Sequence, residues 1–118
     1  MPYGETSVVK TDLGITGTAF DARLTDWDAK ASVEWDDMIY LAAHERRRIT
    51  ALPELPLQTA EVTQTDKDGT NNLIKARYFD NQKQPETALS FRNIAKGLAI
   101  KRVERLKTDS IIYGRVIR

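Results

Sequence analysis

The most regular feature of the chain is a run of apolar residues spaced three or four positions apart in its first half. That spacing places the apolar side chains on one face of an α-helix covering about residues 19–48. The pattern repeats every eleven residues, so a straight helix keeps it on one side. The predicted helix is amphipathic and needs other helices to cover its apolar face. The positions are Phe20, Leu24, Trp27, Ala31, Trp35, Met38 and Ala42.

A second amphipathic helix is predicted over about residues 85–107. Pro85 suits its first position, where the missing N–H would have no partner in any case. Gly97 lies inside this helix at a cost of roughly 1 kcal/mol, which favours close approach of another helix there, with a tolerated defect as the alternative. The apolar positions are Ala88, Phe91, Ala95, Ala99, Val103 and Leu106, supported by Ile94 and Leu98. If the two long helices pack together, the buried residues include Trp27, Trp35, Phe91 and Leu98.

Local signals predict a short helix before the first long one. Thr6 is a candidate N-cap for residues 7–13. Gly14 is suited to end the helix, because glycine adopts the left-handed conformation without a Cβ clash. Thr18 and Asp21 resemble a capping box at the start of the long helix.

Residues 58–80 have no clear period. After the two prolines of ALPELPLQ, the stretches TAEVTQT and NLIKARYF could pair as a short β-hairpin around the turn DKDGTN. Alternatively, NNLIKARYFDNQ could form a short helix with Asn71 as its cap. The helix is favoured, and the hairpin stays open.

The last nine residues, SIIYGRVIR, are β-branched and aromatic, unlike the helical sequence before them. As a strand they would be partly apolar on both faces, with little in the chain to pair with. We therefore predict an all-α helical bundle over residues 1–109, followed by an extended C-terminal arm, 110–118. The arm is expected to dock on a partner by adding to a sheet or by lying in a groove. The alternative is an arm that folds back or frays. The expected partner-binding residues are Ile111, Ile112, Tyr113, Arg115, Val116 and Ile117.

Composition limits the class of protein. The chain has 118 residues, of which 41% are hydrophobic and 30% charged, as in a single globular domain. It contains no cysteine, which excludes a disulfide scaffold. No apolar run approaches the roughly 18 residues of a membrane span, and the first residues lack the layout of a signal peptide. A soluble intracellular protein with no membrane partner is expected.

The charge is unevenly distributed, although the net charge is only +1. Residues 1–45 carry nine acidic and three Lys or Arg residues, whereas residues 83–118 carry nine Lys or Arg and three acidic residues. The asymmetry can have no function beyond solvent-exposed charge, or it can indicate a contact between copies or a nucleic-acid-binding surface. We predict a contact between copies, through Asp26, Asp28 and Glu34 on one copy and Lys101, Arg102 and Arg105 on the next.

Searches for catalytic and ligand-binding patterns give no site. His44 is the only histidine, so HERRR cannot be a two-histidine zinc motif and no Ser-His-Asp triad can form. DKDGTNN resembles a calcium loop, but Lys75 occupies the position of the essential bidentate glutamate. No glycine-rich phosphate loop is present. No catalytic, cofactor-binding or metal-binding residue is therefore assigned, no cofactor is expected, and an enzyme is not expected.

Two stretches of the chain carry a resemblance to a known family. TSVVKTDLGITGTAFDARLTDWDAKASVEWDDMI combines a short helix, the turn LGIT, an Asp-containing cap and a long helix with alanine in its middle. It resembles the start of the small helical head-tail connector proteins of tailed bacteriophages, also called adaptor or head-completion proteins. FRNIAKGLAIKRVERLKTD is similar to the last helix of that family. The resemblance covers residues 6–50 and 85–110, and the family's third helix would have to lie within 58–80.

The resemblance implies a structural virion protein. Such proteins form a homo-oligomeric ring, usually a dodecamer, beneath the portal protein in the neck of the virion, after assembly in the host cytoplasm. The ring extends the DNA channel without sequence-specific binding and presents a platform to the tail or stopper protein. The alternative, from another class, is a small nucleic-acid-binding regulator that uses the basic C-terminal helix. A generic helical protein-interaction domain is a third possibility.

Overall fold

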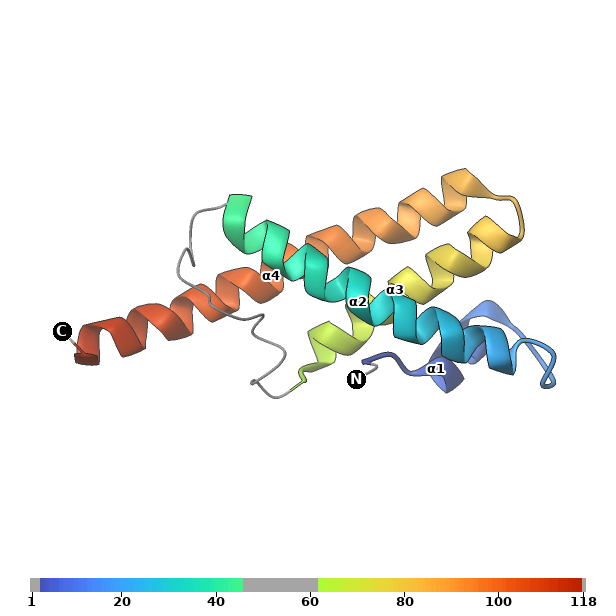
Figure 1. The fold of residues 1–118 in the computed structure, drawn as a ribbon, viewed down its shortest axis with the longest axis horizontal. Coiled ribbons are helices and arrows are strands. Elements are labelled where there is room, and N and C mark those ends of the chain that lie inside the picture. The colour runs from blue at the N-terminus through green and yellow to red at the C-terminus, as the bar shows by residue number, and fades with distance from the viewer. Residues whose placement is uncertain (1–2, 46–61, 118) are drawn as a thin grey trace.

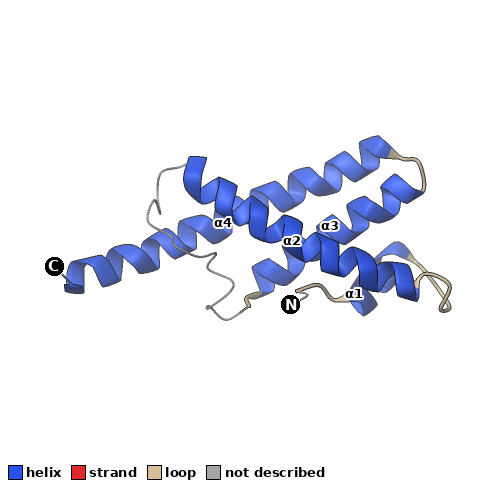
Figure 2. Ribbon diagram, viewed as in Figure 1, coloured by secondary structure: helices blue, strands red, loops and turns tan. Residues whose placement is uncertain are grey.

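The computed structural model describes residues 3–45 and 62–117, and every element in these ranges is an α-helix (Figure 1). The helices are α1 (Thr6–Leu13), α2 (Asp21–Glu45), α3 (Gln64–Asn81) and α4 (Pro85–Ile117). α3 and α4 form an antiparallel pair, α2 lies across both, and α1 packs beside α2 and α3 (Figure 2). The predicted all-α class is confirmed for the described ranges.

The first two helices follow the sequence prediction closely. α2 occupies residues 21–45 of the predicted 19–48, and residues 46–48 lie outside the described ranges. Gly14 ends α1 as predicted, with a φ of 69°, and Ile15 donates its N–H to the Lys10 carbonyl. The predicted N-cap was wrong by one residue, because Thr6 is already helical and the N-cap is Glu5, whose side chain makes no capping hydrogen bond.

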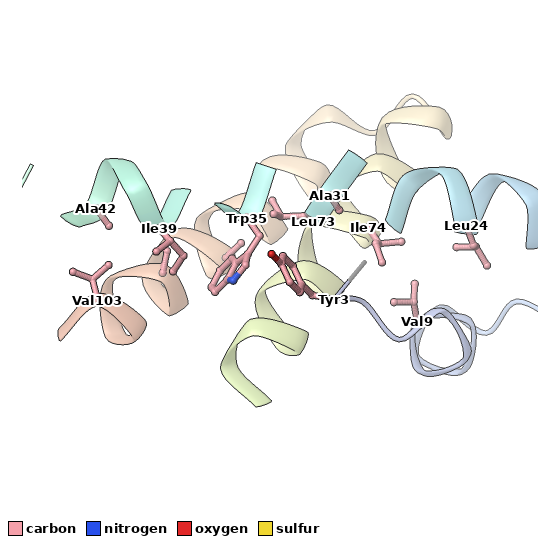
Figure 3. Packing of buried hydrophobic residues seen from close by; sticks show 12 residues of the cluster. Tyr3, Val9, Leu24, Ala31, Trp35, Ile39, Ala42, Leu73, Ile74 and Val103 are labelled. Carbon is pink, nitrogen blue, oxygen red and sulfur yellow. The ribbon is translucent and has the colours of Figure 1, made fainter. Parts of the chain in front are cut away.

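The core forms where the apolar face of α2 meets α3 and α4 (Figure 3). The predicted stripe on α2 faces inward: Leu24, Ala31, Trp35 and Ala42 are buried, and Phe20, Trp27 and Met38 are half-buried. Ile39 adds a buried position that the stripe did not include. Of the residues expected in the core, Trp35 is fully buried, whereas Trp27, Phe91 and Leu98 are half-buried. The contact between the two long helices is therefore confirmed.

Residues 64–81 are helical, so the hairpin alternative was wrong. The favoured helix is correct in type but starts earlier than predicted. Its N-cap is Thr63, which forms a capping box with Asp66. Asn71 lies inside the helix, and DKDGTNN is helix rather than turn, because the capping box and buried contacts outweigh the weak helix propensity of Asp, Gly and Asn.

α4 starts at Pro85 as predicted but continues to Ile117, so the extended conformation expected for residues 110–117 was wrong. Residue 118 and the side chains of residues 105–117 lie outside the description. The β-branched residues lower helix propensity only slightly, and elongation of an existing helix needs no new nucleus. The explanation of Gly97 as a close approach was also wrong, because a Cβ there would meet no atom within 4 Å.

Candidate functional site

The acidic residues predicted for a subunit interface have different environments. Asp26 is exposed and pairs with Lys30 one helical turn away, at 3.0 Å. Asp28 is buried and accepts a hydrogen bond from the Gly4 N–H at 2.9 Å. Glu34 is half-buried and pairs with Arg77 of α3, whose Nε donates at 2.6 Å. Only Asp26 therefore lies open on the surface without a partner on another helix.

The basic residues predicted for the same interface also separate. Lys101 is exposed. Arg102 has an exposed fraction of only 5% and donates from Nε to Asp66 at 3.0 Å. The side chains of Arg105 and of the predicted partner-binding residues 111–117 lie outside the described part. The structure brings none of the predicted acidic residues into contact with Lys101 or Arg102 among the interactions described.

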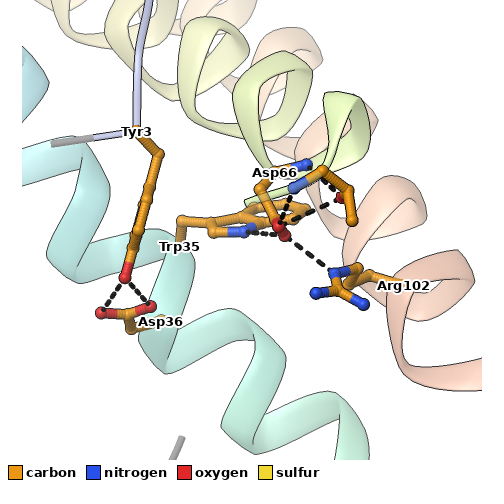
Figure 4. A network of polar contacts seen from close by, with 6 residues as sticks. Tyr3, Trp35, Asp36, Asp66 and Arg102 are labelled. Atoms are coloured by element: carbon orange, nitrogen blue, oxygen red, sulfur yellow. Dashed lines mark hydrogen bonds and ion pairs between the residues drawn. The ribbon is translucent and has the colours of Figure 1, made fainter. Parts of the chain in front are cut away.

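A buried carboxylate, Asp66, joins three helices (Figure 4). Its Oδ1 accepts from the Trp35 indole N–H of α2 and from Arg102 Nε of α4, both at 3.0 Å. Its Oδ2 accepts from the Thr63 N–H at 2.8 Å, within the capping box. These donors satisfy the carboxylate and offset the cost of burying its charge next to an arginine. The only sequence signal for this network was the Thr63-x-x-Asp66 spacing.

The Trp35 ring lies so close to α3 that only glycine fits opposite it. A Cβ on Gly69 would lie 2.1 Å from a ring carbon of Trp35. Because the indole N–H is bound to Asp66, the ring cannot simply move away. The capping carboxylate and the glycine together fix how α2 and α3 meet.

The N-terminal segment Tyr3–Glu5 is held by side chains of α2 and α3. The Tyr3 N–H donates to Ser32 Oγ at 2.9 Å, and the Glu5 N–H donates to Asn71 Oδ1 at 2.7 Å. Between them, the Gly4 N–H binds Asp28. These acceptors, with Asp36, define what we call the segment groove: Asp28, Ser32, Asp36 and Asn71. Sequence reasoning missed it, although Asp28, Ser32 and Asp36 recur every four residues beside the apolar stripe.

The Tyr3 ring is buried, and its hydroxyl donates to the Asp36 carboxylate at 2.9 and 3.2 Å (Figure 4). The pKa of Tyr3 is raised well above its usual value of 10.0, mainly by burial and to a smaller extent by the hydrogen bond to Asp36. Burial also raises the pKa of Asp36, and the hydrogen bond from Tyr3 opposes this change. The raised pKa of Tyr3 favours a neutral tyrosine that donates this hydrogen bond, whereas the raised pKa of Asp36 makes the accepting carboxylate easier to protonate.

A separate apolar groove of about 310 Å³ lies between α2 and α4. It is lined by Met38, Leu41, Ala42, Lys96, Ala99 and Ile100. Leu41, one of these lining side chains, is 54% exposed. The groove offers apolar contact with one cationic side chain and no convergent polar groups.

Within residues 3–45 and 62–117, no cluster of three or more His, Cys, Asp or Glu side chains could hold a metal ion. No helix in the described ranges is both long and apolar enough to cross a membrane. Comparison with known proteins returned no matching family model, no matching curated protein and no matching solved structure.

Proposed function

We propose that this chain is a structural virion protein, a head-tail connector that forms a ring beneath the portal and links the head to the tail. The proposal rests on the sequence resemblance of residues 6–50 and 85–110. One observation carries it further: the order of the helices is the order that the resemblance implies. A short helix, a glycine turn and a long helix are followed by α3, in the place of the missing third helix, and by α4.

The alanines of the last helix also support the proposal. The resemblance places alanines on the packing face of that helix, and Ala88, Ala95 and Ala99 are all buried in α4. Small side chains there allow α4 to lie close to α2 and α3.

The C-terminal part of α4 is the proposed attachment to the portal protein. In Figure 1 it extends past the ends of α2 and α3. Since residues 110–117 are helical, we propose docking as a helix in a groove, where an amphipathic helix presents one face to a partner. The proposed contact residues remain Ile111, Ile112, Tyr113, Arg115, Val116 and Ile117.

The proposal is tested by adding the purified chain to portal-bearing heads that lack a connector. The full chain is expected to sediment with the heads, and a chain that lacks residues 110–118 is expected to remain in the supernatant. The truncated chain should keep a cooperative melting transition, which is the control for folding. Normal attachment of the truncated chain would contradict the proposed role of this segment, and failure of the full chain to attach would contradict the connector function.

The nucleic-acid-binding alternative has less support. Two of the arginines that make the last helix basic have acidic partners within the chain: Arg102 binds Asp66, and Arg92 Nη2 binds Asp80 at 2.5 Å. Paired arginines have less positive charge to offer to phosphates. The alternative predicts salt-dependent binding of a random DNA duplex in fluorescence anisotropy, whereas the connector proposal predicts weak binding at physiological salt.

A further inference from the structure

We propose that the segment groove is a recognition site for an extended Tyr-Gly segment, and that a second copy of this chain can supply that segment by exchanging its residues 3–13. This inference goes beyond the connector function and does not depend on it. It concerns how two copies of the chain join, whatever they build.

The segment groove binds the backbone of residues 3–5 through side-chain hydrogen bonds, as a protein binds an extended peptide ligand. Tyr3, Gly4 and Glu5 are consecutive, and each donates its N–H to a different side chain, at 2.7–2.9 Å. Within a helix or sheet, such donors would bind backbone carbonyls instead. The acceptors Asp28, Ser32 and Asn71 are polar, so water can take the place of the segment when it leaves.

The groove also selects side chains. A Cβ on Gly4 would lie 2.4 Å from Asp28 Oδ1 and 2.7 Å from Ile74 Cδ1, so only glycine fits there. The Tyr3 ring is buried, and its hydroxyl meets both oxygens of Asp36. Tyrosine followed by glycine is therefore the sequence that the groove accepts.

Apart from these contacts, residues 3–13 are held by two ion pairs, Lys10–Asp21 and Lys75–Asp12, both at 2.8 Å, and by few buried apolar side chains. Val9 is the only side chain of α1 that is buried. An open cavity of about 330 Å³ lies between α1 and the start of α2, with Lys10 and Leu24 in its lining. The apolar contacts that separate when residues 3–13 leave are those of Tyr3, Val9 and the half-buried Leu13, and the same residues of the second copy restore them.

The connection from α1 to α2 is long enough for exchange. Residues 14–20 form a loop that is exposed except at the half-buried Ile15 and Phe20, and in it Gly14 and Gly17 have φ values of 69° and 78°. Extended, seven residues span up to roughly 23 Å. Exchange of an identical element reproduces every contact of the closed chain, so it needs no new recognition surface.

The first test measures binding of the segment when it is not part of the same chain. The probe is a synthetic peptide with the sequence of residues 3–13, acetylated at Tyr3 and fluorescently labelled at its other end. The host is the full chain with Gly4→Ala, which disables its own segment and leaves the groove intact. Anisotropy should show binding at least about tenfold tighter than to the wild-type chain, whose own segment competes.

Two controls make this result specific. A probe that itself carries Gly4→Ala should bind the same host roughly tenfold to a hundredfold more weakly, because its Cβ clashes and a hydrogen bond to a carboxylate is lost. A Gly97→Ala chain should behave as the wild type, because it makes the same chemical change where a Cβ meets nothing within 4 Å. Tyr3→Ala provides a second host. If both hosts unfold, or if neither binds the probe, the segment is a fixed part of the fold and the proposal fails.

The second test asks whether another copy supplies the segment. Chains with Gly4→Ala have an intact groove, and chains with Asp28→Ala and Ser32→Ala have an intact segment. Native mass spectrometry of a mixture should detect a complex of one chain of each kind, more abundant than any complex formed by either variant alone. If the mixture contains only what the separate samples contain, exchange between copies does not occur.

Discussion

At the scale of single residues, the packing of the helices depends on which glycine lies against another helix, where a Cβ atom would clash. Gly69 and Gly97 both lie inside helices, yet only Gly69 faces another helix, with the Trp35 ring against it. Local pattern could not identify Gly69 as a contact, because it lies in the stretch 58–80 that has no clear period, whereas Gly97 interrupts a regular helical pattern. The close approach that we expected at Gly97 is found at Gly69.

These two glycines give a matched prediction for stability. Gly69→Ala should lower the free energy of unfolding by about 2–3 kcal/mol, because the added Cβ overpacks against a fully buried ring. Gly97→Ala should raise it by up to about 1 kcal/mol, because alanine is the better helix former and has open space. Urea unfolding followed by circular dichroism measures both. Equal effects of the two substitutions would contradict the packing at Trp35.

Arg102 and Lys101 are neighbours in the sequence, but only Arg102 is expected to contribute strongly to stability. Arg102→Met should cost about 3 kcal/mol, because it leaves the buried Asp66 carboxylate without its cationic partner. Lys101→Met, the control, removes an exposed charge and should change the free energy of unfolding by less than about 0.5 kcal/mol. Both values follow from urea unfolding. A small loss for Arg102→Met would mean that Asp66 finds enough support from Trp35 and Thr63 alone.

The raised pKa of Tyr3 predicts that the protein loses stability at alkaline pH. The raised pKa means that the folded chain holds the phenolic proton more tightly than the unfolded chain does. Its contribution is therefore fully present below about pH 10 and is lost as the pH rises toward the folded pKa. Above pH 10, the free energy of unfolding should fall by up to about 1.4 kcal/mol per pH unit from this group. Urea unfolding from pH 8 to 11 should show a shallower fall for Tyr3→Phe, and parallel curves for the two proteins would refute the assignment.

At the scale of helices, the sequence predicted the elements whose buried side is apolar. α2 buries a regular apolar stripe, so its period was plain in the sequence. α3 is different, because its buried side includes Asp66, Gly69, Thr70 and Asn71. Trp35 and Arg102 bind Asp66 there, and the Glu5 N–H binds Asn71. The Trp35 ring also lies against Gly69. Such partners are distant in sequence, so neither the start of α3 nor the segment groove could be predicted from local pattern.

The prediction for the end of α4 was wrong for another reason. Residues 110–117 have the composition of a strand, and local composition was the only guide. In the structure the preceding 25 residues of α4 are already helical, so each further residue adds to an existing helix. Strand propensity depends strongly on the neighbours available, and no strand lies within the described ranges.

Truncation provides a test of this helix. The four helices contain 8, 25, 18 and 33 residues, so deletion of residues 110–118 should lower the ellipticity per molecule at 222 nm by about a tenth. An extended segment would contribute almost nothing to that signal. The melting temperature is the control and should stay within a few degrees. Unchanged ellipticity per molecule would favour the extended conformation over the helix.

At the scale of the whole molecule, the uneven charge along the sequence is partly used inside the chain. The acidic first half supplies Glu34 to Arg77 and Asp12 to Lys75, and both basic partners lie on α3. The basic last helix supplies Arg102 to Asp66 and Arg92 to Asp80. These pairs hold helices together within one copy. The charges that remain for a neighbouring copy are those on open surface, of which Asp26 and Lys101 belong to the predicted interface.

This division sharpens the expected effect of charge reversal on assembly. If neighbouring copies in the proposed ring meet through opposite charges, Lys101→Glu should slow and weaken assembly on portal-bearing heads, and Asp26→Lys in the same chain should restore part of it. Lys83→Glu is the matched control, since it makes the same change in net charge in the exposed turn between α3 and α4. Sedimentation with heads at 50 and 300 mM salt measures the effect, which should shrink at high salt as the charges are screened.

If Lys83→Glu impairs assembly as much as Lys101→Glu, net charge rather than a contact at Lys101 is responsible. If neither change has an effect, copies join through other surfaces, and the exchange of residues 3–13 becomes the leading account of their contact.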